Sequence, residues 1–168
     1  MEDTLDTQAE TTDAELARKA SLVLDPQISL LGRSIHELDK RVCRSIDSAL
    51  VDASSVSQTQ ALAIIYIWRH EDHEPVYQYM LERQFHLSTP TLTASLKSLV
   101  SRGFITRTRD PDDGRYYRLN LTENGRNIVP ACIDAFTQVD EKLACRLSDE
   151  ERQTFVALTN KLLSRDES

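Results

Sequence analysis

The sequence lacks any long hydrophobic run. Its longest apolar stretch extends from Ala61 to Trp68, far short of the ~20 residues that a transmembrane helix needs. Residues 1–10 are acidic, whereas a secretory signal begins with basic residues and continues with apolar ones. These absences predict a cytoplasmic protein that has no membrane partner.

Cysteine is scarce, and its spacing matches no disulfide framework or zinc finger. Cys43, Cys132 and Cys145 are odd in number and include no CxxC pair. A redox-sensing Cys43, or a nucleophilic Cys43 or Cys132, is an alternative that no nearby histidine motif supports. His70 and His73 could contribute to a metal site, but no third ligand is identifiable. We therefore predict no enzyme activity, no metal and no cofactor.

Positive charge is also scarce overall, since the 168 residues carry a net charge of −7. Taken alone, this value argues against a polyanionic partner, because phosphate binding requires clustered lysine and arginine. The distribution changes that conclusion. From Arg83 to Arg126 there are eight basic and four acidic residues, a net charge of +4 that leaves −11 elsewhere. The central segment is electropositive.

Length and composition predict one globular domain with an appendage. The chain has 168 residues, of which 40% are hydrophobic and 28% charged, as in ordinary globular domains. Residues 1–20 are acidic and polar and predict a disordered tail. Residues 21–168 then form a single domain, in which 21–52 and 123–165 are expected to be dimerisation helices around a lobe at 57–122.

A long amino-terminal helix is predicted by apolar residues that alternate at spacings of three and four. The seam comprises Ile28, Leu31, Ile35, Leu38, Val42 and Ala49. Two uses of this seam are open: packing within one chain, and contact with a second subunit. We favour the subunit contact and expect a homodimer, because so long a helix extends beyond the core of so small a domain.

Capping signals mark the starts of further helices. Ser57–Gln60 and Ser148–Glu151 each have the pattern of a capping box, and Thr122 can cap the helix after it. Pro75 predicts the first turn of a short helix, Pro75–Phe85. Helical spacing then predicts the inward-facing residues, which are Ala61, Ile64, Ile65 and Trp68 in one helix and Val76, Tyr79 and Met80 in the next.

A second helix follows after a tight break at Phe85–Leu87, from the N-cap Ser88 to Arg102 before Gly103. Its expected buried stripe is Leu92, Leu96, Leu99 and Val100. The opposite face is small and hydroxylic, which is typical of a helix-turn-helix whose second helix enters the DNA major groove. The candidate base and phosphate contacts are Ser88, Thr89, Pro90, Thr91, Thr93, Ala94, Lys97 and Ser98.

A basic hairpin is predicted next, with strands at Phe104–Thr108 and Arg115–Leu121 and a turn at Asp110–Gly114. Its arginines are Arg107, Arg109, Arg115 and Arg118. Arg115 lies beside the turn, where a guanidinium could enter a narrow minor groove. Helix and hairpin together predict a mainly α, winged helix-turn-helix (α+β) fold that binds double-stranded DNA.

The segment Leu87–Gly125 resembles the MarR family of winged-helix regulators. The family's D-P-x-D-x-R wing is present as Asp110–Arg115, and its L-T-x-x-G pattern as Leu121–Gly125. The resemblance extends more weakly over Ile28–Leu163. It implies a dimeric, sequence-specific transcriptional regulator, more often a repressor, that places two recognition helices on a pseudo-palindromic operator.

The same resemblance implies roles for single residues. Asp113 would orient Arg115, the wing-tip residue for the minor groove. Members of the family often carry arginine where this chain has Ala94 and Ser98, so direct base readout is expected to differ. A small aromatic effector is a further implication, and the aromatic residues that could line its pocket are Tyr66, Trp68, Tyr77, Tyr79 and Phe85. The alternatives are a winged-helix protein-interaction module, such as an adaptor or anti-repressor, and a thiol-based redox regulator.

Overall fold

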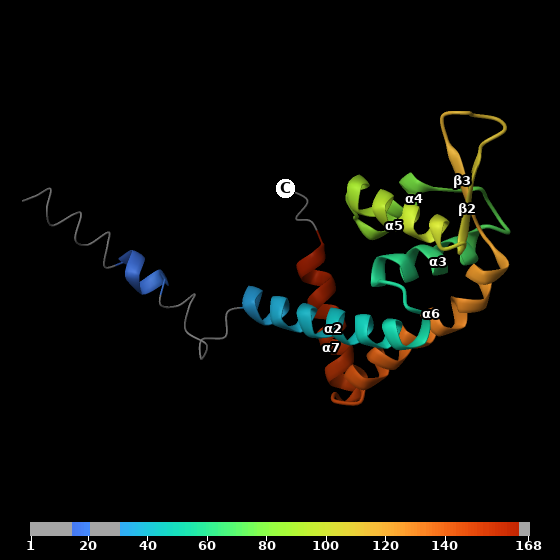
Figure 1. The fold of residues 1–168 in the computed structure, drawn as a ribbon. Helices are drawn as coiled ribbons and strands as arrows, with labels where there is room; N and C mark the ends of the chain where they lie inside the picture. The colour runs from blue at the N-terminus through green and yellow to red at the C-terminus, as the bar shows by residue number, and fades with distance from the viewer. Residues whose placement is uncertain (1–14, 21–30, 165–168) are drawn as a thin grey trace, which may run out of the picture. The chain divides into compact units, whose positions relative to one another are not determined.

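A computed structural model describes residues 15–20 and 31–164 of the chain. The chain divides into two compact units, residues 1–42 and 43–168. The elements are α2 (Leu31–Ser54), α3 (Gln58–His70), β1 (Val76–Tyr77), α4 (Gln78–Phe85), α5 (Thr89–Ser101), β2 (Ile105–Arg109), β3 (Tyr117–Leu121), α6 (Glu123–Ala144) and α7 (Asp149–Leu163) (Figure 1). The fold is mainly helical with a small antiparallel sheet, as the sequence predicted.

Of the predicted tail at residues 1–20, the structure describes only residues 15–20. Residues 15–20 form a short, exposed helix, and the rest of the tail lies outside the described residues, as does Ile28 of the seam. Leu31 and Ile35, at the start of α2, are 62% and 50% exposed. The division of residues 21–168 into dimerisation helices and a lobe stays a prediction.

The end of α2 belongs to the second unit, and there its buried residues are Ile46 and Leu50. The predicted seam continued to Ala49 instead, which is only half-buried. Burial in this part of the helix follows from packing within the second unit. None of the described helices combines the length and the hydropathy needed to cross a membrane.

The predicted helix starts are confirmed. Ser57 and Ser148 each form a capping box, and the hydroxyls of Ser88 and Thr122 accept hydrogen bonds from amides in the first turns of α5 and α6. Each of these side chains satisfies a backbone donor that has no partner within its own helix. Local sequence therefore determines where these four helices begin.

The predicted helix Pro75–Phe85 is wrong at its start. Val76 and Tyr77 form the strand β1, whose residues pair with Leu119 and Arg118 of β3. The backbone of Tyr77 is therefore extended, and α4 begins only at Gln78. The resulting sheet has the order β1-β3-β2, so that β3 lies in its centre.

The core of the second unit comprises side chains from α3, α4, α5 and the sheet. The largest fully buried ones include Ile64, Ile67, Leu81, Leu92, Leu96, Leu99, Ile105 and Leu119. Three expectations are wrong, because Trp68, Tyr79 and Val100 are 44%, 45% and 40% exposed. In α4 the buried position is taken by Leu81.

The junction between α5, β2 and α6 explains the glycine of the L-T-x-x-G pattern. The Thr122 hydroxyl donates to the Gly103 carbonyl at 2.6 Å, and the Thr122 amide donates to the Phe104 carbonyl at 3.0 Å. These bonds bring the Phe104 carbonyl against Gly125, which is buried in the first turns of α6. A methyl group at Gly125 would overlap that carbonyl oxygen.

Candidate nucleic-acid interface

The helices α4 and α5 form the expected helix-break-helix. The break passes through His86, whose φ of 51° is left-handed. A side-chain bond joins the two helices, because Gln78 Nε2 donates to Thr93 Oγ1 at 2.9 Å. Thr93, a predicted contact residue, is therefore half-buried and engaged with α4.

The outer face of α5 remains accessible. Ser88, Thr89, Pro90, Thr91, Ala94 and Lys97 are exposed, and Ser98 is half-buried. The hydroxyls of Ser88 and Thr91 lie 2.8 Å apart, so that one donates to the other beside the amino end of the helix. Small hydroxylic side chains at a helix start suit close contact with a phosphate or a base edge.

The wing turn is built around Asp110, which the sequence suggested only as a turn residue. Its side chain is 3% exposed. The amides of Asp112 and Asp113 donate to its Oδ1 at 2.8 and 2.9 Å. Arg118 Nε and the Tyr77 hydroxyl donate to its Oδ2 at 2.6 and 2.5 Å. All four bonds favour the carboxylate, and Arg118 contributes most to holding the pKa of Asp110 far below its usual range.

This lowered pKa predicts how stability depends on pH. Because the folded protein favours the carboxylate, the stabilisation by Asp110 is present above the ordinary pKa of 3.8 and declines as pH falls below it. Asp110→Asn is therefore expected to lower the melting temperature at pH 7, by a margin that narrows below about pH 4. Thermal unfolding from pH 2 to 7 measures this margin.

The matched control is Asp112→Asn. Asp112 contacts the same arginine at 3.3 Å, but its side chain is 88% exposed, so its removal should change the melting temperature little at any pH. A margin for Asp110→Asn that stayed constant from pH 7 to 2 would contradict the assignment.

Arg115 stands at the wing tip beside its expected partner. Its Nε and Nη2 donate to the two oxygens of Asp113 at 3.0 and 2.7 Å, and its side chain remains 83% exposed. The same contact lowers the pKa of Asp113. Asp113 therefore fixes one edge of the guanidinium while the rest of the side chain extends into solvent.

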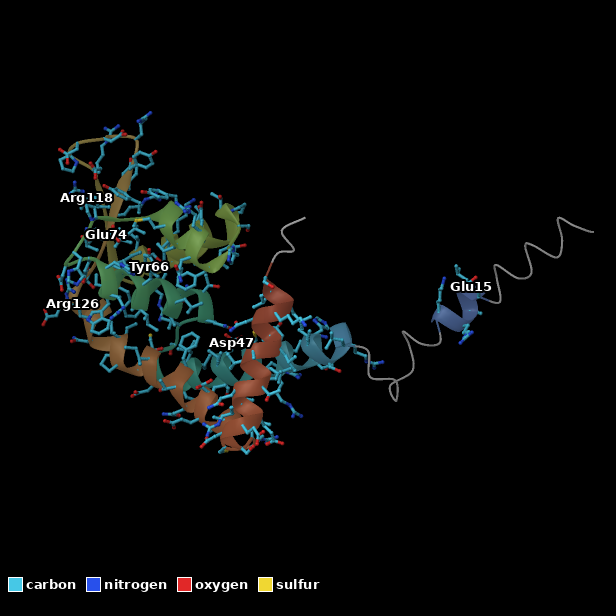
Figure 2. The ribbon with its side chains drawn as sticks, turned by 180° about the vertical axis from the view of Figure 1, so that it is seen from behind. Glu15, Asp47, Tyr66, Glu74, Arg118 and Arg126 are labelled. Atoms are coloured by element: carbon cyan, nitrogen blue, oxygen red, sulfur yellow. The ribbon has the colours of Figure 1, made fainter. Side chains whose placement is uncertain are left out.

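The other wing arginines differ in their contacts. Arg107 is exposed and lies over the Tyr117 ring at 4.7 Å, and Arg109 Nε donates to the Gly114 carbonyl at 2.9 Å. Arg118 instead bonds Asp110 and Asp112, so most of its charge is matched within the wing. Figure 2 labels Arg118 on the hairpin. The exposed basic side chains of this surface include Lys97, Arg107, Arg109 and Arg115.

A second buried carboxylate, Glu71, lies at the base of the wing and was missed in the sequence. Its side chain is 4% exposed. It accepts the amide of Leu121 at 2.9 Å and pairs with Arg126 in the first turn of α6, which Figure 2 labels. Fifty residues separate Glu71 from Leu121, so no local pattern could identify this contact.

The aromatic residues considered for an effector pocket are only partly brought together: Tyr66 and Tyr79 line one open pocket with Met80, Arg83 and Gln84. Tyr66 stacks on His70 with centroids 4.3 Å apart and meets Phe85 edge-on at 5.8 Å. Tyr77 and Tyr79 instead stack on each other beside the wing. Trp68 is exposed, so the structure does not bring the five together in one pocket.

The candidate metal and thiol residues are placed as follows. His70 lies 3.4 Å from Glu74, and within the described ranges no three His, Cys, Asp or Glu side chains are grouped to hold a metal. Cys43 is half-buried and Cys145 exposed. Burial raises the pKa of the Cys132 thiol, which disfavours the thiolate that nucleophilic chemistry needs.

A protein-family model matches the part of the chain that contains these elements. The family model described as "MarR family" matches residues 55–117, which include α3, the helix-break-helix and the wing tip. Over these residues the chain is similar to the MarR family.

Curated relatives match over part of their length. The organic hydroperoxide resistance transcriptional regulator of Bacillus subtilis is 32% identical over 105 residues, 62% of this chain and 66% of the relative. The regulator HosA of Escherichia coli O111:H- is 36% identical over 74 residues, 44% of this chain and 55% of the relative. The chain therefore spans between about half and two thirds of these relatives.

Solved structures of regulators share the fold over most of the chain. The S. aureus MepR–DNA complex superposes with a TM-score of 0.75 at 21% identity, covering 80% of this chain and 97% of that one. A probable transcriptional regulator from Pseudomonas aeruginosa gives 0.65 at 25% identity, covering 83% and 99%. The winged-helix prediction is confirmed.

Proposed function

We propose that this protein is a cytoplasmic, dimeric regulator of transcription that binds specific sequences of double-stranded DNA. The main observation in its support is that the small, hydroxylic outer face of α5 and the exposed wing-tip residue Arg115 occur together in one compact unit. The likeness to a regulator solved on DNA supports the same conclusion. Repression is the mode expected from the family, and catalysis has no part in the proposal.

The two elements have different tasks in this proposal. The outer face of α5 enters the major groove, where Thr91 and its neighbours contact base edges. Arg115, oriented by Asp113, enters the adjacent minor groove, where its charge interacts with the negative potential between the phosphates. Lys97 and Arg107 add contacts to the backbone, which position the protein without reading sequence.

The dimer in this proposal rests on α7. None of its fifteen residues is buried. Its exposed side chains include three large apolar ones, Phe155, Leu158 and Leu162, and each of these is at least 50% exposed. A second copy of the chain would cover this face and place two recognition helices on successive major grooves, about 34 Å apart. A ligand that changed this separation would weaken binding, which is the expected route for any effector.

Two substitutions test the division of labour. Arg115→Ala is expected to weaken binding to every duplex by about tenfold or more, since each dimer loses two arginines. Thr91→Ala should instead change the preference among sequences. Both are measured on sites selected from a random DNA pool with the parent protein, where a two-fold symmetric consensus is expected. Equal losses on all sequences for both variants would contradict the assignment.

Salt dependence separates DNA binding from use of the wing as a protein-interaction surface. Phosphate contacts release counterions, so log K should fall with log salt by roughly 0.9 per contact on duplex DNA. A protein that bound no duplex at low ionic strength would overturn the proposal.

A further inference from the structure

Tyr77 connects the wing to the first helix of the helix-turn-helix in three ways. Its backbone pairs with Arg118 in the sheet, and its residue position is the N-cap of α4. Its hydroxyl donates to Asp110 Oδ2 at 2.5 Å. One residue thus belongs to the sheet, the helix start and the wing turn at once.

The hydroxyl is distinctive among the four donors to Asp110. Arg118 and the amides of Asp112 and Asp113 all belong to the wing that contains Asp110. Only Tyr77 comes from outside the wing. Its bond therefore holds the turn against the helix-turn-helix, whereas the other three hold the turn together.

The wing tip has few other attachments. The base of the hairpin is fixed by the buried side chains of Ile105, Leu119 and Leu121, but between Thr106 and Arg118 only Asp110 is buried. The Tyr116 ring adds a contact, with its centroid 5.7 Å from that of Tyr77. Phenylalanine at position 77 would keep this ring contact and remove the hydroxyl alone.

We propose that Tyr77 is a positioning residue. Its hydroxyl, through Asp110, determines where Arg115 lies relative to α5. This inference rests on the proposed function, since Arg115 is the minor-groove residue there. The amide of Asp113 donates to Asp110, and the side chain of Asp113 accepts from the guanidinium of Arg115. Loss of the hydroxyl frees the turn to move and spreads the guanidinium over positions that no longer match the minor groove.

The test is a double-mutant cycle on the selected duplex. Tyr77→Phe is expected to weaken binding about fivefold to tenfold, no more than Arg115→Ala does, because the hydroxyl acts only through that arginine. In the Arg115→Ala background the same change should weaken binding less than about twofold, because the positioned group is already absent. Tyr79→Phe is the matched control, since Tyr79 stacks on Tyr77 at 5.7 Å but is not a donor to Asp110. It should leave affinity unchanged.

A measurement without DNA separates this inference from the proposed function. The amides of Asp112 and Asp113, which bond Asp110, should exchange with solvent faster in Tyr77→Phe than in Tyr79→Phe, with unchanged protection in α3 and α6. Unchanged exchange at both amides would overturn the inference even if the parent bound no duplex. Independent, multiplicative losses for Tyr77→Phe and Arg115→Ala would also overturn it. If the parent bound no duplex but these amides exchanged faster in Tyr77→Phe, the proposed function and the role of Arg115 would be refuted. The role of the Tyr77 hydroxyl in holding the turn would still be supported.

Discussion

Replacing Gly125 with alanine is expected to lower the free energy of unfolding by about 3 kcal/mol or more, at the upper end for an overpacked site. The added methyl would overlap the Phe104 carbonyl oxygen, which is backbone and is held by two bonds from Thr122. Rotation of a side chain cannot relieve this overlap, because the obstructing atoms belong to the backbone. Relief requires α6 to separate from the start of β2, and denaturant unfolding measures the cost.

Gly32→Ala is the matched control for this prediction. Gly32 is the second residue of α2, and a methyl group built there meets nothing within 4 Å. Alanine is a better helix former than glycine, so this variant should match the parent or gain at most roughly 0.5 kcal/mol this close to the helix end. Equal free energies of unfolding for Gly125→Ala and Gly32→Ala would contradict the expected overlap with the Phe104 carbonyl oxygen.

The second large effect is expected from charge placed on α7. The double substitution Leu158→Glu and Leu162→Glu introduces two carboxylates on one helix face, at positions that are 57% and 58% exposed. Burial of these charges in a subunit contact would be costly, so the protein should become monomeric. Loss of the second half-site contact should then reduce affinity for the selected duplex by about 100-fold or more.

The control for α7 is Asn160→Glu, which adds charge to the same helix at an exposed polar position. It should remain dimeric in sedimentation equilibrium and bind as the parent does. A double variant that stayed dimeric, or a parent that was monomeric, would contradict the proposed use of this face.

Local patterns predicted much of the fold. Ser57, Ser88, Thr122 and Ser148 cap the helices that the sequence assigned to them, because capping depends on residues within one turn. The break at His86 and the hairpin turn could be predicted for the same reason. The Asp113–Arg115 pair was implied by the resemblance to the MarR family, and the structure contains it.

What the sequence did not predict depends on distant contacts. The bond from Tyr77 to Asp110 spans 33 residues, and the one from Leu121 to Glu71 spans 50. The strand β1 exists only because β3 is its partner, so Pro75 alone suggested a helix start. Trp68 shows the same limit: its helical spacing suited a core position, but neighbouring elements leave 44% of it exposed.

The buried side chain of Glu71 has a mechanical consequence. One carboxylate accepts the amide of Leu121 in the hairpin and pairs with Arg126 in the first turn of α6. Because one carboxylate makes both bonds, a movement of α6 away from the hairpin would break at least one of them. A tilt of α6 that kept both bonds would have to move the hairpin, and with it the wing tip.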